Sequence, residues 1–189
     1  MVNSSCGFDL NFFELLQLRV KEIAPMERHG ILSIDEIHLR ENVSVCSKSL
    51  TYKGLIDFGE DGPKAMDFDS KANHALVLMF QPLSGSFQQA IATFAGRGPT
   101  EGAVLAKIVI KAIILLERVG LVVHGIVSDC AATNRKMWSE LGVSGARNGF
   151  KNYFEHPARE GRNVYVFADT PHLIKNVRNR LYNSKELKV

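Results

Sequence analysis

The chain has 189 residues, of which 46% are hydrophobic and 23% charged, so it can bury a sizeable core and is not an intrinsically disordered protein. A balance of 23 Lys and Arg against 20 Asp and Glu gives a net charge of +3, which permits a phosphate-rich partner without demonstrating one. The three cysteines and six histidines show no spacing typical of a zinc module or a disulfide framework, which favours an intracellular protein.

Membrane insertion and secretion are not expected. The most apolar stretch, residues 103–127, is interrupted by charged side chains and split by Gly120, which makes it a poor membrane span. The first residues are polar and lack the basic start and apolar centre of a secretory leader.

The N-terminal part of the chain predicts a helix followed by a strand. Apolar residues recur at helical spacing over residues 9–23, with Asp9 or Asn11 as the N-cap. Residues 31–39 have the apolar pattern of a strand that is buried on at least one face, and Asp35 closes its apolar run. Residues 43–58 carry β-type side chains, and residues 59–70 form an acidic connection.

The middle of the chain predicts a hairpin and then a largely buried helix. Two apolar runs at residues 74–83 and 87–94 are separated by Ser84-Gly85-Ser86, a spacing that favours an antiparallel hairpin. Together with the first strand, the hairpin forms a three-stranded meander. A helix with only a narrow polar stripe then runs over residues 100–119, with Thr100 as its N-cap and Gly120 as its C-terminal stop.

A second apolar strand, residues 121–127, follows that helix at once. Asp129 stands at the end of this strand, and Thr133 or Asn134 caps a short helix that runs through Leu141. Residues 142–162 are rich in Gly, Asn and charge and are predicted to be a surface excursion anchored by aromatic side chains, namely Phe150, Tyr153 and Phe154.

The last predicted strand, residues 163–168, runs into Asp169 and then a helix. Thr170 can cap this helix and Pro171 suits its first turn, and one face is apolar, with Leu173, Val177 and Leu181. The order of elements predicts an α/β protein with an incomplete ribonuclease-H-like fold. Its sheet is expected to be mixed and five-stranded, with three strands antiparallel and with flanking helices.

Two acids at strand ends are the strongest chemical signal. A right-handed crossover through the long helix would lay the strand that ends at Asp129 beside the strand that carries Asp35. The two carboxylates would then meet and form a site for a hard divalent cation, Mg²⁺ or Mn²⁺. Either acid alone is explained equally well as a turn former or a helix cap. Glu36 points to the opposite face of its strand, and a structural role is predicted for it.

Five stretches resemble the catalytic region of P-element-type transposases, including the THAP-domain transposases. They are Leu32-Ser-Ile-Asp35-Glu36-Ile, Gly54-Leu-Ile-Asp-Phe-Gly59, His74-Ala-Leu-Val-Leu-Met79, Ser128-Asp129-Cys-Ala-Ala-Thr-Asn134 and Phe167-Ala-Asp169-Thr-Pro-His-Leu-Ile-Lys-Asn-Val-Arg178-Asn. The last is the most specific, because several unusual residue types recur in order. Cys130 and Thr170 depart from the family pattern, where a glycine and a second proline are common.

The resemblance implies a ribonuclease-H-like region in which three acids, DDE, hold two divalent metals for DNA strand cleavage and transfer. Asp35 and Asp129 correspond to its first two acids. The third, a glutamate, lies beyond a guanine-nucleotide-binding insertion, and this chain stops near the start of that insertion. Activity of the chain alone is therefore not expected.

By the same resemblance, Asp169 and Lys175 are early members of a GTP site. The partner is DNA at transposon ends in a nuclear or other intracellular setting, and a homo-oligomer is compatible with the family.

The expected organisation is a helical lead-in over residues 1–30, a ribonuclease-H-like core over residues 31–183 and the start of a truncated insertion over residues 184–189. Two other interpretations remain open. One is a domesticated or remnant domain that binds DNA, a nucleotide or a protein without catalysis. The other is an unrelated α/β nucleotide-binding domain, which is disfavoured because Asp35 and Glu36 follow the first strand where a Gly-rich phosphate loop would stand.

Overall fold

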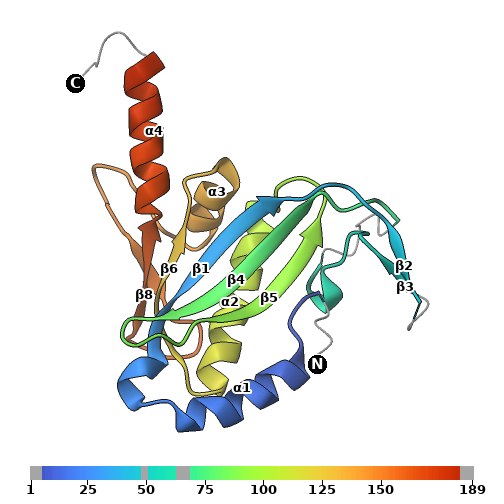
Figure 1. Cartoon of the computed structure of the whole chain (residues 1–189). Coiled ribbons are helices and arrows are strands. Elements are labelled where there is room, and N and C mark those ends of the chain that lie inside the picture. The colour runs from blue at the N-terminus through green and yellow to red at the C-terminus, as the bar shows by residue number, and fades with distance from the viewer. Residues whose placement is uncertain (1–5, 48–50, 63–68, 184–189) are drawn as a thin grey trace.

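The computed structural model describes residues 6–47, 51–62 and 69–183, and within these ranges it contains four α-helices and a six-stranded mixed sheet (Figure 1). The helices are α1 (Leu10–Glu22), α2 (Gly102–Arg118), α3 (Ala132–Glu140) and α4 (Thr170–Asn183). The strands of the large sheet are β1 (His29–His38), β4 (His74–Pro82), β5 (Gln89–Gly96), β6 (Val122–Ser128), β7 (Tyr153–Glu155) and β8 (Asn163–Ala168). The predicted insertion start at residues 184–189 lies outside the described residues.

Short elements complete the connections. Strands β2 (Ser44–Cys46) and β3 (Thr51–Lys53) form a separate two-stranded sheet. Single 3-10 turns cover Pro25–Arg28 and Gly59–Asp61. The predicted acidic connection over residues 59–70 is thus described only in part, because residues 63–68 lie outside the described ranges.

The sheet has the order β5-β4-β1-β6-β8-β7. The pairs β1–β6 and β6–β8 are parallel, whereas β1–β4, β4–β5 and β7–β8 are antiparallel. The meander, the mixed sheet and the crossover that places β6 beside β1 are therefore confirmed. The expected count of five strands was wrong, because the surface excursion at residues 142–162 contains β7. That strand has three residues and a single buried side chain, Phe154, which leaves no period for a sequence pattern to show.

The core lies between one face of the sheet and α2, which runs behind the sheet in Figure 1. Helix α2 is buried along most of its length, as its narrow polar stripe predicts, and α3 packs against it. The sheet contributes fully buried side chains from alternate positions, among them Leu32, Leu78, Phe80, Phe94 and Ile126. Helix α1 crosses below the sheet and adds its own apolar stripe, Phe13, Leu16 and Val20, to the same core.

The second face of the sheet is not covered by any helix of the described chain (Figure 1). Its side chains are half-buried or exposed, including Ile31, Val127 and Phe167 from the three parallel strands. Asp35 points to this open face, because it alternates with the buried residues Leu32 and Ile34.

A register shift interrupts the pairing of β1 with β6. His29 and Gly30 pair with Val122 and Val123, but Ile31 pairs with Gly125, so that β6 has one more residue than β1 at this point. The burial pattern of β6 changes at the same place: Val123 is buried before the shift, and Ile126 and Ser128 are buried after it.

Of the four described α-helices, α1 has a predicted N-cap, and the other three begin at residues that the predicted caps do not imply. Asp9 caps α1 as one of the two predicted candidates, with Oδ1 accepting from the amides of Asn11 and Phe12 at 2.9 and 3.3 Å. Helix α2 begins after Glu101, and the amide of Thr100 instead donates to Oε1 of Glu36 at 2.8 Å.

Helices α3 and α4 begin earlier in the chain than the predicted caps imply, whereas α2 begins one residue later. Helix α3 begins at Ala132 behind Ala131, so neither Thr133 nor Asn134 caps it. Thr170 is the first helical residue of α4, with Asp169 in the capping position, where its carbonyl accepts from the amide of Leu173 at 2.9 Å.

Helix α4 leaves the end of β8 and projects away from the sheet (Figure 1). None of its side chains is buried, so the predicted apolar face of Leu173, Val177 and Leu181 is exposed. No helix in the described ranges combines the length and the apolar character needed to cross a bilayer.

Candidate functional site

Asp35 lies near the C-terminal end of β1 and is exposed on the open face of the sheet. Its backbone pairs with Val77 of β4, which fixes the position of the residue from one side. Oδ1 accepts a hydrogen bond from the amide of Glu36 at 2.9 Å. Glu36 itself has the predicted structural role, since its carboxylate holds the amide of Thr100 in the loop before α2.

Asp129 follows the last residue of β6 and is half-buried. Oδ1 accepts two hydrogen bonds, from the amide of Ala131 at 2.8 Å and from Nδ2 of Asn134 at 2.6 Å. Two donors on one oxygen fix the rotamer of the carboxylate. Among the described residues, none donates to Oδ2, which therefore keeps its lone pairs for another ligand.

The register of the parallel strands brings Asp35 and Asp129 to the same level of the sheet. Ser33 of β1 pairs with Val127 of β6, and both acids stand two residues further along their strands. Because side chains alternate across a strand, Asp35 belongs to the open face with Ser33, while Asp129 directly follows the last residue of β6. The strand order inferred from sequence is thus the observed one, and it carries these two acids, 94 positions apart (129 minus 35), to the C-terminal ends of adjacent parallel strands.

Asp169 reaches the same edge of the sheet from the next strand. Ser128 pairs with Ala168, and the amide of Asp169 donates to the carbonyl of Ser128 at 2.9 Å. Its Oδ2 lies 4.0 Å from Nε2 of His172. Lys175 lies further along α4, exposed to solvent, and forms no ion pair with any described residue. The structure therefore brings Asp169 to the strand ends but leaves Lys175 on the projecting helix.

The donor set at the strand ends fits a hard cation, because it consists of carboxylate oxygens that are accessible from the open face. In the described part of the chain, no group of three or more His, Cys, Asp or Glu side chains is arranged to hold a metal ion. A divalent ion at Asp35 and Asp129 would thus complete its coordination with water or phosphate oxygens, as Mg²⁺ commonly does.

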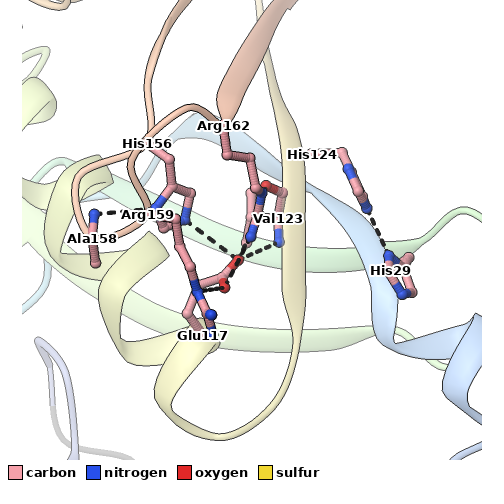
Figure 2. Close-up of polar contacts among 8 residues, drawn as sticks. All are labelled: His29, Glu117, Val123, His124, His156, Ala158, Arg159 and Arg162. Atoms are coloured by element: carbon pink, nitrogen blue, oxygen red, sulfur yellow. Dashed lines mark hydrogen bonds and ion pairs between the residues drawn. The ribbon is translucent and has the colours of Figure 1, made fainter.

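A buried polar cluster at the opposite end of the sheet was missed by sequence reasoning (Figure 2). Its centre is Glu117, near the end of α2, whose side chain is 8% exposed. Arg162 donates to both carboxylate oxygens, from Nη2 to Oε1 at 2.6 Å and from Nη1 to Oε2 at 3.1 Å. The amide of Val123 donates to Oε1 at 3.1 Å, and Nη2 of Arg162 donates to the carbonyl of Val123 at 2.7 Å. The cluster ties α2, β6 and the loop between β7 and β8 together.

Two more side chains surround the Glu117 carboxylate. His156 is fully buried, with Nε2 3.4 Å from Oε1, and Nε of Arg159 lies 3.6 Å from Oε2. Burial lowers the pKa of His156, and the charge of Arg162 lowers it further. Burial opposes ionisation of Glu117, but the hydrogen bonds from Arg162 and Val123 outweigh it and hold the pKa of Glu117 below its usual 4.5. His156 is thus a neutral ring, and Glu117 a carboxylate, at neutral pH.

A histidine pair lies beside this cluster (Figure 2). Nδ1 of His29 and Nε2 of His124 are 2.7 Å apart, and their rings stack with centroids 5.0 Å apart. Burial and the neighbouring His29 lower the pKa of His124. The sequence offered one usable signal for these polar groups: Glu117 and His124 interrupt apolar stretches that are otherwise suited to full burial, and such residues need partners.

This chain is similar in sequence and in fold to known proteins. Residues 4–142 match the sequence family described as TNP-like, RNase H N-terminal domain, which is well over half of the chain. The chain belongs to this family. The core strands β1, β4, β5 and β6 and the crossover helix α2 all lie within the matched residues of this RNase H N-terminal domain.

Two relatives of the RNase H N-terminal domain described here are named as transposases. The chain is 48% identical to the transposable element P transposase of Drosophila melanogaster over 69 residues, which is 36% of this chain and 9% of that protein. It is 26% identical to the DNA transposase THAP9 of Homo sapiens over 183 residues, which is 97% of this chain and 20% of that protein. The chain therefore spans a fifth or less of either relative.

A solved structure shares the fold. The Drosophila P element transposase strand transfer complex matches with a TM-score of 0.71 at 24% identity, over 97% of this chain and 35% of that chain. Together with the family match, this supports the predicted RNase H-like fold and the relationship to P-element transposases.

Proposed function

We propose that this chain is part of the catalytic region of a P-element-type DNA transposase, and that Asp35 and Asp129 bind Mg²⁺ or Mn²⁺ there. The observation that supports this proposal is the parallel pairing of β1 with β6, in which Ser33 lies beside Val127, two residues before Asp35 and two residues before Asp129. The names of the two relatives and of the solved complex support the same class of reaction, DNA strand cleavage and transfer.

Each residue has a distinct role in this proposal. Asp35 and Asp129 supply anionic oxygens from rigid strand ends, and Asn134 and the amide of Ala131 orient Asp129 by occupying its Oδ1. Glu36 fixes the chain next to Asp35 through the amide of Thr100. Bound divalent ions supply Lewis-acid stabilisation of charge on a phosphodiester. The third acid expected from the family resemblance, a glutamate, is not assigned to any residue of this chain.

A metal titration tests the proposal. In the parent chain, Mn²⁺ or Mg²⁺ at about ten times its Kd should raise the free energy of unfolding by about 1.4 kcal/mol, which corresponds to roughly 3–6 °C in Tm for a chain of this size. Asp35→Asn and Asp129→Asn should each remove most of this metal-dependent shift, because only one carboxylate remains. Differential scanning fluorimetry against metal concentration measures the effect.

Glu36→Gln is the matched control. Glutamine keeps an oxygen that can accept from the amide of Thr100, and the side chain lies on the other side of β1 from Asp35. This variant should keep the full metal-dependent shift. If the parent shows no shift with either metal, or if Glu36→Gln loses the shift as fully as Asp35→Asn does, the metal site is rejected.

Asp169 and Lys175 are proposed as contacts to a guanine nucleotide, with Lys175 neutralising phosphate and Asp169 contacting the base or a metal. The exposure of Lys175 on α4 leaves its ammonium accessible to an anion. GTP should raise the Tm of the chain, and Lys175→Gln should reduce this effect. An equal response of the parent and of Lys175→Gln to GTP would exclude a role for this lysine.

A second candidate function is non-catalytic binding of DNA, a nucleotide or a protein by a domesticated or remnant domain in the nucleus or elsewhere in the cell. The exposed basic residues of α4, Lys175, Arg178 and Arg180, favour a phosphate-bearing ligand. Fluorescence anisotropy with labelled duplex DNA separates the two functions. Binding that persists in EDTA and is unchanged in Asp35→Asn, combined with no metal-dependent Tm shift, would favour the second function.

A further inference from the structure

Two histidines face each other across β1 and β6, at the end of the sheet opposite the strand-end acids (Figure 2). His29 is the first residue of β1, and Gly30 and Leu32, one and three positions later, are buried, so His29 belongs to the open face of the sheet. Nδ1 of His29 lies 2.7 Å from Nε2 of His124, and both side chains are half-buried. Two imidazole nitrogens, which are common metal ligands, thus reach one point from separate strands.

The register shift between β1 and β6 puts His124 in this position. His124 is the additional residue of β6: it lies between Val123 and Gly125 and has no partner in the register of β1. Such a bulge commonly directs a side chain to a position that regular pairing would not give it. Val123, the residue before it, is buried on the core side, so His124 lies on the open face beside His29.

The protonation of the pair leaves a lone pair available to a metal ion. At a separation of 2.7 Å, one of the two facing nitrogens carries no proton, because two N–H groups would repel each other. Burial and the adjacent His29 lower the pKa of His124, which keeps this ring neutral at neutral pH.

The proton between the rings also has an alternative place. The outward nitrogens, Nε2 of His29 and Nδ1 of His124, form no hydrogen bond with a described residue, and neither is among the buried polar atoms that lack a partner, so solvent reaches both. The proton can therefore move through solvent to an outward nitrogen of the same ring. Both facing nitrogens are then free to bind one ion.

The spacing of the rings is close to that of two ligands of one Zn²⁺. Tetrahedral Zn²⁺, with Zn–N distances of about 2.0–2.1 Å, holds two nitrogens about 3.3 Å apart and the centroids of two imidazole rings about 5.2 Å apart. The ring centroids of His29 and His124 are already 5.0 Å apart. The two rings therefore need only tilt in place, until their lone pairs converge, and the strands need not separate.

The charges around the pair permit a bound cation. Arg162 lowers the pKa of His124 and Glu117 raises it, so the two act in opposite directions at this ring. They are joined by two hydrogen bonds of 2.6 and 3.1 Å, and their charges largely cancel at the histidine pair. Since the ligands are nitrogens and not carboxylate oxygens, the pair favours Zn²⁺ over Mg²⁺.

We propose that His29 and His124 form a Zn²⁺ site that links β1 to β6 at the bulge, with water completing the tetrahedral coordination. This site differs in place and in ligand type from the Mg²⁺ or Mn²⁺ site proposed at Asp35 and Asp129, and it does not depend on that proposal. Bound Zn²⁺ would hold the two strands together at the position where their regular pairing is interrupted.

Isothermal titration calorimetry of the full chain with Zn²⁺ tests the proposal, in a buffer with excess Mg²⁺ to occupy carboxylate sites. The parent should bind one Zn²⁺ that is lost in two variants, His29→Asn and His124→Gln. In each variant an amide group stands near the lost ring nitrogen and can still form a hydrogen bond, but it is a poor ligand for Zn²⁺. Because losing even an outer partner of a metal ligand costs about 10–100-fold in affinity, each variant should bind at least about tenfold more weakly.

His38→Asn is the matched control. His38 lies at the other end of β1, where its ring contacts that of His74 with centroids 4.8 Å apart, so it tests whether any neighbouring histidine pair suffices. This variant should bind Zn²⁺ as the parent does, and circular dichroism checks that all variants are folded. Nuclear magnetic resonance spectra that correlate ring ¹H and ¹⁵N should show Zn²⁺-dependent shifts of Nδ1 of His29 and Nε2 of His124.

Three results would overturn the proposal. The first is a parent that binds no Zn²⁺, which would leave the histidine pair as a hydrogen bond alone. The second is parent-like affinity in both His29→Asn and His124→Gln. The third is a loss of binding in His38→Asn as large as in His29→Asn. Because Mg²⁺ is in excess throughout, none of these results depends on whether Asp35 and Asp129 bind metal.

Discussion

Glu117 shows how a single buried carboxylate organises the end of the molecule opposite the strand-end acids. It accepts from Arg162 and from the amide of Val123, and it lies beside His156 and Arg159, so residues from α2, β6 and the β7–β8 loop meet on two oxygens. Such a network is stabilising only when every charge has a partner. His156 adds no charge because it is a neutral ring: its Nδ1 accepts from the amide of Ala158 at 3.1 Å, which leaves the proton on Nε2, 3.4 Å from Oε1 of Glu117 and without a hydrogen bond.

The stability of the chain should decrease in mildly acidic solution. The pKa of His156 is lowered in the folded state from the usual 6.5, so the unfolded chain takes up a proton first. The stability that depends on neutral His156 is fully present above pH 6.5 and is lost as the pH falls through the lowered folded pKa. His124 contributes in the same direction. Urea unfolding at a series of pH values should show a falling free energy of unfolding below that point.

His156→Asn tests the origin of this pH dependence. An asparagine oxygen can still accept from the amide of Ala158 but does not titrate, so the variant should lose part of the decrease between neutral and mildly acidic pH. Circular dichroism at neutral pH confirms that the variant is folded. An unchanged pH profile in His156→Asn would assign the effect to other groups. The contribution of Glu117 is separable, because it is present above pH 4.5 and is lost only as the pH falls through its lower folded pKa.

At the scale of elements, the close approach of β1 to β4 depends on Gly30. A Cβ at this position would overlap the backbone carbonyl oxygen of Gln81 and the ring of Phe80. Because backbone atoms cannot rotate away, Gly30→Ala should lower the free energy of unfolding by about 1–3 kcal/mol. Urea unfolding of the variant measures this loss.

Gly145→Ala is the control for Gly30→Ala. A Cβ at Gly145 meets no atom within 4 Å, and the loss of glycine flexibility in the unfolded chain should leave stability equal or slightly higher. If Gly30→Ala is as stable as the parent, then β1 and β4 can move apart enough to accommodate the added Cβ, and the close approach at Gly30 does not limit stability.

The sequence predicted those elements whose patterns are local. The strands β1, β4, β5, β6 and β8 and the helices α1 and α2 each carry enough apolar residues at a regular period to be found, and the loop Ser84-Gly85-Ser86 indicated the hairpin. Strand β7 was missed because three residues form no period. The cap at Thr100 was wrong because α2 begins one residue later than expected, after Glu101, and the contact of the Thr100 amide with Glu36, distant in sequence, gives no local pattern.

The difference between local sequence patterns and contacts of residues distant in sequence also applies to the candidate functional site. The crossover rule fixes which strands are neighbours, so β6 could be placed beside β1 from sequence, and the pairing of Asp35 with Asp129 at their ends stays a prediction. The Glu117 cluster could not be predicted, since its members come from separate elements and only the folded chain shows that Arg162 reaches Glu117.

For the whole molecule, the structure indicates an uneven distribution of stability. Helix α2 has a long buried stripe, whereas α4 projects from the sheet and has no buried side chain among its described residues (Figure 1). Backbone amides in elements without tertiary packing open at little cost, while core elements open only near global unfolding.

Hydrogen exchange measured by mass spectrometry should resolve this difference. Amides in α4 are expected to exchange about a thousandfold faster than those in α2, or faster still, because their opening does not break the core. Helix α2 in the same sample is the internal reference. Similar protection of the two helices would show that the apolar face of Leu173, Val177 and Leu181 is covered in solution, against the exposure described above.

The additional residue in β6 at the register shift also limits how the length of this chain can change. Without it, Ser33 would pair with Ile126, and Ser128, whose side chain is buried on the α2 side, would come level with Asp35. Asp129 would then point away from the open face. Removing or adding one residue between Gly120 and Asp129 is therefore expected to turn Asp129 away from the face that carries Asp35, although both acids would still be present in the sequence.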